Sequence, residues 1–319
     1  MEAHLIDRSG PRTIAFDRQG LEELRSSAQF FWLDVREPAP EDVELIGSIF
    51  GFHPLSIEDA INFGQRPKLD DYDDYVFLVV YGQAPDEDNL VEVHCFYSEK
   101  LLITIRRDHC PAFSEVRERQ ARRRDPLADP VLVLYRVVDG LVDSFFPLLA
   151  DFDDLIDAIE EGIAERPDDE QLRRIFRLKR DLVRLRKVIA PQRDLAAGMA
   201  SGIQQLPGST TESERAFRDV YDHLIRLTDQ LDSYRDLVTG VMDVYLSTVS
   251  NRLNAVMKQL TVLATVFLPL TFITGFFGQN FAWMVRSVGG EAAFWTLGVA
   301  LQLGVAVALV GMFRRRGWV

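Results

Sequence analysis

Three residues at the end of a long apolar run have the chemistry needed to contact a metal ion. Residues 260–277 contain no charged side chain, and Gly278, Gln279 and Asn280 follow directly. Repeated around a ring of chains, their amide and carbonyl oxygens would replace part of a cation's water shell, or bond to that shell, without the deep trap that carboxylates create. Glycine and asparagine also end many helices, so the triplet alone is also consistent with a helix cap.

The apolar segments on either side of this triplet are typical of membrane spans. Residues 260–277 and 292–313 are charge-free runs, and both approach the ~20 residues that a helix needs to cross a bilayer. We predict transmembrane helices at about residues 258–278 and 292–313, joined by an external loop at 279–291. The alternative is a pair of buried core helices in a soluble protein.

The charges that flank the two runs are unevenly distributed. Arg252 and Lys258 precede the first run and residues 314–316 are all arginine, whereas the connecting loop has only Arg286 and Glu291. Positive residues favour the cytosolic side, so we expect both termini in the cytosol, the spans in the cell's inner (plasma) membrane, and a basic cytosolic tail at residues 314–319.

A long helix is predicted to lead into the first span. Thr211 and Glu214 form a capping-box pattern, and no proline follows until Pro269. The apolar residues ahead of the span recur at spacings of three and four, as in helices packed along their length: Phe217, Val220, Leu224, Leu227, Leu231, Tyr234, Val238, Val241 and Tyr245. Two spans cannot enclose a conducting path alone, so we expect this seam to join copies into a symmetric ring.

The rest of the chain reads as an α/β domain followed by helices. Strand-like runs at residues 30–35, 75–81, 91–97 and 101–105 alternate with helix-like pieces, and residues 90–105 are typical of a hairpin. Asp129 and Pro130 begin a helix expected to reach Glu165, and a basic helix follows Pro167. The latter part of the helix that ends at Glu165 is acidic. This part either pairs with the basic helix or presents a solvated face. The predicted parts are therefore 1–125 (α/β), 126–208 (helical hairpin) and 209–278 (stalk and pore-lining helix).

Composition narrows the class of partner. The net charge of -13 argues against nucleic-acid binding, which needs clustered positive charge, and favours cations. Two cysteines cannot build a disulfide framework, and the first residues lack the apolar stretch of a secretory signal, so the part ahead of the spans is expected in the cytosol. No nucleophile–base cluster or phosphate-binding loop stands out. We therefore expect neither an enzyme nor an organic cofactor.

Several motifs resemble the CorA family of magnesium and cobalt channels. The resemblance is carried by YLSTVSN at residues 245–251, NAVMK at 254–258, FLPLTFITG at 267–275 and the triplet with Phe281. It extends to residues 51–55, 65–68 and 217–223 and to the basic end with Trp318. It therefore covers nearly the whole chain.

The resemblance implies a funnel-shaped homopentamer in the lipid bilayer that conducts Mg²⁺, with Co²⁺ and Ni²⁺ as further candidates. Gly278, Gln279 and Asn280 match the family's selectivity filter. The positions that match its ion path are Asn254, Met257, Leu260, Leu268 and Thr271. The positions that match its acidic sites for regulatory Mg²⁺ between subunits, which gate the channel, are Glu58, Asp59, Asp139 and Asp219.

Two departures from the family pattern bear on the choice of ion. Gln279 stands where the family has methionine, and Met284, Val285 and Arg286 replace a run that ends in glutamate, so a loop carboxylate gives way to positive charge. A proton-coupled Zn²⁺ transporter of the ZntB type is the alternative within transport. A non-conducting membrane scaffold is a second alternative, which shares the spans and the seam.

Overall fold

The computed structural model describes residues 1–319 except 9, 28, 85–89, 123–126 and 319, and the chain divides into two compact units. The first unit comprises residues 1–162 and 169–241, and the second comprises 163–168 and 242–319. The predicted boundary at residues 125 and 126 lies outside the described residues.

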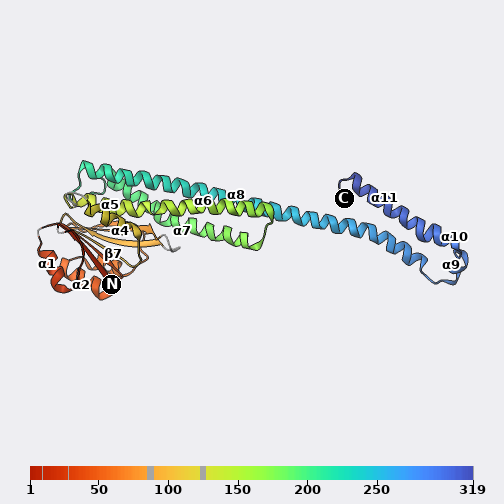
Figure 1. The fold of residues 1–319 in the computed structure, drawn as a ribbon, viewed down its shortest axis with the longest axis horizontal. Helices are drawn as coiled ribbons and strands as arrows, with labels where there is room; N and C mark the ends of the chain where they lie inside the picture. The colour runs from red at the N-terminus through yellow and green to blue at the C-terminus, as the bar shows by residue number, and fades with distance from the viewer. Residues whose placement is uncertain (9, 28, 85–89, 123–126, 319) are drawn as a thin grey trace. The chain divides into compact units, whose positions relative to one another are not determined.

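A mixed sheet forms the centre of the first unit (Figure 1). In the described residues its order is β2-β1-β3-β7-β6-β5-β4, and β3 pairs with β7 in parallel while the other pairs are antiparallel. The strands are β1 (Glu2–Asp7), β2 (Gly10–Thr13), β3 (Phe31–Arg36), β4 (Lys68–Asp71), β5 (Val76–Gln83), β6 (Leu90–Tyr97) and β7 (Leu101–Arg106). The four predicted strands and the hairpin are confirmed, whereas β1, β2 and β4 carry too few apolar residues to be predicted.

Helices cover the sheet on both faces, which explains why β5 and β6 are apolar along most of their length. One layer contains α1 (Arg18–Ser26), α2 (Pro40–Phe50) and α3 (Pro54–Ile61). The other contains α4 (Pro111–Ala121), α5 (Pro130–Asp143) and α7 (Asp169–Ala200), which contact the strands directly.

A buried ionic network joins the sheet to α4. Asp34 is 1% exposed, and its carboxylate accepts hydrogen bonds from Arg106 at 2.9 and 3.1 Å, from Arg117 at 2.7 Å and from Thr104 at 3.0 Å. A buried carboxylate is tolerated only when it is paired and fully hydrogen-bonded. The network therefore fixes the register of β3 against β7 and α4.

The prediction of one helix from Asp129 to Glu165 is wrong, because the chain forms α5 and then α6 (Phe145–Glu165). Ser144 separates them: its hydroxyl donates to the Leu141 carbonyl at 2.5 Å and accepts the backbone N–H of Gln83 at 2.8 Å. Such a side chain competes with helical backbone bonding. The start is as predicted, with the Asp129 carboxylate accepting the N–H of Leu132.

Helix α8 (Thr211–Phe277) is the long helix that the sequence predicts. Its cap lies one residue earlier than the predicted Thr211–Glu214 box. The Thr210 hydroxyl accepts the N–H of Ser213 at 3.2 Å, and the Ser213 hydroxyl accepts the N–H of Thr210 at 2.9 Å. A serine therefore takes the reciprocal role expected of glutamate.

The apolar seam of α8 packs inside its own chain, so the expectation that it joins copies is wrong. From Phe217 to Val241 its residues are at most 9% exposed within a single chain. Phe217 packs edge-on against Tyr135 of α5, and Asp232 forms an ion pair with Arg186 of α7. Heptad spacing indicates packing along a helix but does not say which helix covers it.

The second unit contains the two candidate membrane spans. They lie in α8 and in residues 291–315, with a mean hydropathy of 2.0, and 0% and 6% of the apolar window is buried. Core helices of a soluble protein would be mostly buried, so that alternative is not supported. After α8 come α9 (Ala282–Ser287), α10 (Glu291–Ala293), a π-helix η1 (Phe294–Ala300) and α11 (Leu301–Arg315).

Candidate ion path and metal centre

The residues predicted to line an ion path share an open face of α8. Asn254 and Thr271 are exposed, and Met257, Leu260 and Leu268 are 53%, 57% and 69% exposed. Large apolar side chains that are exposed within a single chain indicate a surface that contacts lipid, contacts another chain or lines a narrow aqueous path.

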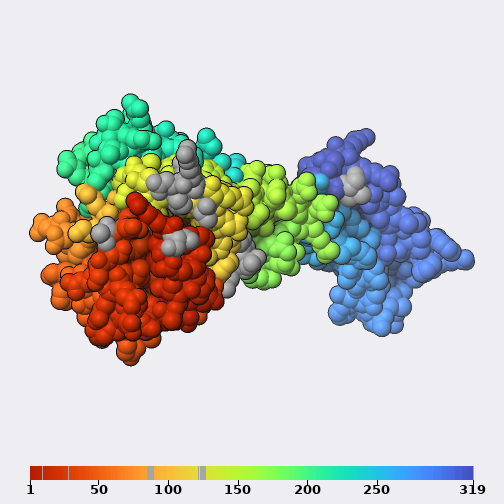
Figure 2. Space-filling view, turned by 60° about the vertical axis from the view of Figure 1, so that its left-hand side comes forward, coloured from red at the N-terminus to blue at the C-terminus, as the bar shows by residue number. Residues whose placement is uncertain are grey.

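The opposite face of α8 is half-buried. Its members are Val262, Thr265, Val266, Pro269, Leu270, Ile273 and Phe277. The second span lies against the last part of α8 (Figure 2). Two hydrogen bonds join α8 to the second span and to the tail after it: Lys258 donates to the Gly317 carbonyl at 2.9 Å, and Gln302 donates to the Thr274 hydroxyl at 2.9 Å. At about 100° per residue, the half-buried face and the predicted path lie on opposite sides of the helix. The second span therefore leaves the predicted path open.

The predicted filter begins where α8 ends. The N–H of Gly278 donates to the Thr274 carbonyl at 2.9 Å, and the N–H of Gln279 donates to the Phe276 carbonyl at 3.3 Å. Both hydrogen bonds belong to the last turn of α8. The backbone of Gly278 and Gln279 therefore ends the helix, as the helix-cap interpretation of the triplet expects. The Asn280 side chain is exposed and makes no hydrogen bond to any described residue. Its amide is thus available to bind an ion directly or to hydrogen-bond to the water molecules that surround the ion.

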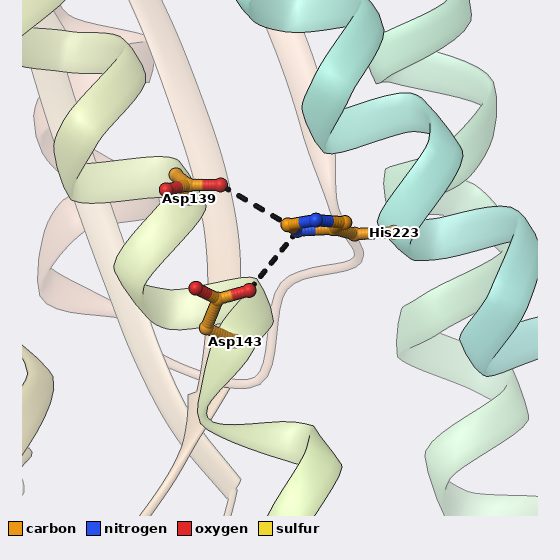
Figure 3. A group of neighbouring side chains, drawn as sticks. All are labelled: Asp139, Asp143 and His223. Carbon is orange, nitrogen blue, oxygen red and sulfur yellow. Dashed lines mark ion pairs between the residues drawn. The ribbon is translucent and has the colours of Figure 1, made fainter.

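A separate group of ionisable side chains lies in the first unit, between α5 and α8 (Figure 3). His223 Nδ1 lies 3.0 Å from Asp143 Oδ1 and 3.6 Å from Asp139 Oδ1, and both carboxylates point toward the imidazole. On the far side of the ring, Asp219 Oδ1 lies 4.0 Å from His223 Nε2. The Tyr135 hydroxyl donates to Asp219 at 3.3 Å.

Burial and mutual repulsion shift the titration of this group. Burial, followed by the negative charge of Asp143, raises the pKa of Asp139 to about 6, although His223 opposes the shift. Burial and the charge of Asp139 also raise the pKa of the Tyr135 hydroxyl. The cluster therefore holds more negative charge than one imidazole neutralises, which favours binding of a cation.

The donor set fits a divalent cation. One ligand atom each from Asp139, Asp143 and His223 lies within 4.8 Å of the others. Asp139 Oδ1 and His223 Nδ1 are buried, and apart from the ion pairs within the cluster neither has a hydrogen-bond partner among the described residues. Two carboxylates suit Mg²⁺, and the imidazole nitrogen adds affinity for Co²⁺, Ni²⁺ or Zn²⁺. Asp143 and His223 were not predicted as ligands. The signal was that each stands four residues after a predicted one, on the same helical face.

The four predicted regulatory acids separate into two places within one chain. Asp139 and Asp219 both face His223, whereas Glu58 and Asp59 lie on α3. Lys68 Nζ lies 2.6 Å from the carboxylates of both Asp59 and Asp70. In a single chain the counter-ion of Asp59 is therefore a lysine.

A buried carboxylate anchors the segment between Asp59 and Lys68. Glu92 is 7% exposed and accepts the N–H groups of Gly64 and Gln65 at 2.5 and 2.9 Å and a hydrogen bond from His94 at 2.8 Å. Burial alone would raise the pKa of Glu92, but these bonds, led by that from His94, hold it below its ordinary value. The loop that follows α3 is thus held rigidly at the sheet.

Comparison with known families identifies the family of this chain. A family model described as CorA-like Mg²⁺ transporter protein matches residues 27–315. The chain belongs to this family. The predicted family is confirmed. The predicted fold class, an α/β domain followed by long helices and two candidate spans, is confirmed as well.

Relatives of this CorA-like chain are similar over most of its length. It is 37% identical over 315 residues to the cobalt/magnesium transport protein CorA of Thermotoga maritima, covering 95% of the chain and 87% of that protein. It is 28% identical over 247 residues to the zinc transport protein ZntB of Yersinia enterocolitica, covering 76% of the chain and 74% of that protein. The solved CorA magnesium transporter of Methanocaldococcus jannaschii has a TM-score of 0.83 at 23% identity, covering 100% and 99%.

Proposed function

We propose that this chain is one subunit of a homo-oligomeric membrane channel for divalent cations, with Mg²⁺ as the principal ion and Co²⁺ and Ni²⁺ as further substrates. The name of the Thermotoga relative supports this ion class. An inside-negative membrane potential favours entry by about 2.3 kcal/mol per charge per 100 mV, or roughly 4.6 kcal/mol for a divalent ion, so no energy-coupling site is needed.

The open face of α8 is the observation that carries the proposal. The second span packs on the opposite side, and this leaves Asn254, Met257, Leu260, Leu268 and Thr271 free to meet their copies around a symmetry axis. A pentamer is the ring that the family resemblance implies. Both termini would lie in the cytosol of a cell with this chain in its inner (plasma) membrane, because positive charge flanks the spans on that side.

We extend the proposal to gating by bound Mg²⁺ at subunit boundaries. Asp139 and Asp219, with His223 beside them, would face Glu58 and Asp59 of a neighbouring subunit. Carboxylates gathered there repel one another, so a divalent ion that bridges them stabilises the closed ring. Lys68 already neutralises part of the charge of Asp59.

Proton-coupled Zn²⁺ transport is the second candidate. It is favoured by the likeness to ZntB, by Gln279 in place of the family's methionine, and by the nitrogen ligand that His223 offers. The two candidates differ in their dependence on a pH gradient.

A matched pair of cysteine variants tests the path. Leu268→Cys and Leu263→Cys make the same substitution at exposed positions about 140° apart around α8, and only Leu268 lies on the predicted path. The native Cys95 and Cys110 are buried. We expect a water-soluble cationic thiol reagent to block Mg²⁺ flux in vesicles containing Leu268→Cys and to spare Leu263→Cys. Equal block of both variants, or block of Leu263→Cys alone, would contradict the assignment.

A further inference from the structure

A single amide stands in the otherwise apolar second span. Between residues 292 and 313 there is no charged residue, and Gln302 is the sole asparagine or glutamine. A polar side chain in a bilayer is costly unless it finds a partner, and such residues usually face protein. Gln302 Nε2 donates to Thr274 Oγ1 of α8 at 2.9 Å.

Thr274 relays this bond to the outer end of the first span. Its hydroxyl donates to the Leu270 carbonyl at 2.9 Å, and its own carbonyl accepts the N–H of Gly278 at 2.9 Å. Gly278 is the first residue of the triplet that also contains Asn280. The amide of the second span is thus two hydrogen bonds from the candidate filter.

A local distortion aims Gln302 at this partner. The π-helix η1 ends at Ala300, two residues before Gln302. A π-helical turn holds about one residue more than an α-helical turn, so it rotates every later side chain by about 100° relative to an undistorted helix. The direction of Gln302 therefore depends on a feature that is frequent at functional sites.

We propose that Gln302 is a positioning residue for the selectivity filter: its bond to Thr274 fixes the last turn of α8, and with it the placement of Gly278 and Asn280 in the ring. The inference rests on the proposed channel function. Hydrogen bonds between membrane helices change equilibria by about 3- to 15-fold, and we expect an effect of that size on ion selectivity.

A double-mutant cycle tests the bond from both sides. Gln302→Leu removes the amide, and Thr274→Val removes the hydroxyl while keeping the shape. In vesicles with equal amounts of assembled protein, each variant should lower the ratio of Mg²⁺ to Na⁺ flux by about 3- to 15-fold, and the double variant should be no worse than either single one. Thr274→Ser should restore the wild-type ratio.

The control is Thr239→Val, which removes an α8 hydroxyl that donates to the Arg235 carbonyl four residues earlier, as the Thr274 hydroxyl donates to Leu270, but lies ahead of the span. It should leave the ratio unchanged. Conduction with an unchanged ratio in Gln302→Leu and Thr274→Val, or effects that simply add in the double variant, would overturn the positioning role alone. A wild-type protein that conducts no ion would overturn the channel proposal as well.

Discussion

Replacing Asn280 with alanine is expected to reduce Mg²⁺ uptake by at least about 100-fold while the oligomer still assembles. The Asn280 amide is exposed at the end of α8 and has no bond to another described residue that the substitution would break. A hydrogen bond to a charged group is worth about 1.5–3 kcal/mol, and a ring repeats the loss in every subunit. Each 1.4 kcal/mol on the barrier is a factor of about ten in rate.

The measurement is the initial rate of Mg²⁺ entry into vesicles, normalised to the amount of oligomer found by size-exclusion chromatography. Gln279→Met is the matched control, because it changes the neighbouring side chain to the residue that the family carries and keeps the Asn280 amide. We expect a mild effect from it. Wild-type uptake by a correctly assembled Asn280→Ala protein would remove Asn280 from the filter.

Removing one carboxylate from each side of the proposed boundary site, Asp59 and Asp219, should weaken the response of the channel to internal Mg²⁺ by about tenfold or more. In the wild type we expect Mg²⁺ to protect the part of the chain ahead of the spans from proteolysis, because a bridging ion stabilises the closed ring. In the Asp59→Ala, Asp219→Ala double variant the protection midpoint should shift upward by about tenfold or more, since carboxylate number sets divalent affinity.

The control for lost charge is Asp154→Ala, Asp157→Ala. Both residues are exposed on α6, so this variant removes the same number of carboxylates away from the cluster. It should keep the wild-type midpoint. Identical protection curves for the wild type and the Asp59→Ala, Asp219→Ala variant would rule out this site as the sensor.

Features with local signals could be predicted from the sequence. The charge-free runs on either side of the 279–291 loop indicate two spans because a bilayer demands about 20 apolar residues in succession. The cap at Asp129 and the hairpin at residues 90–105 depend on neighbours in the chain, and both are present. The family motifs added the candidate filter, which no spacing rule alone distinguishes from a helix end.

Features that depend on distant partners could not be predicted. The heptad seam indicates a packed helix, but only the fold shows that Phe217 meets Tyr135 of the same chain. The break at Ser144 arises from a bond to β5, which the local helical pattern conceals. His223 joins Asp139 and Asp143 only because the fold brings α5 and α8 side by side.

Ion flux into vesicles that contain only the purified protein distinguishes a divalent-cation channel from a proton-coupled carrier and from a non-conducting scaffold. Mg²⁺, Co²⁺, Ni²⁺ and Zn²⁺ would each be offered with and without a pH gradient, under an inside-negative potential. We predict entry of Mg²⁺ and Co²⁺ at rates that do not depend on the pH gradient. Entry of Zn²⁺ alone, and only with the gradient, would contradict it in favour of proton-coupled transport, and no entry of any ion by a stable oligomer would contradict it in favour of a scaffold.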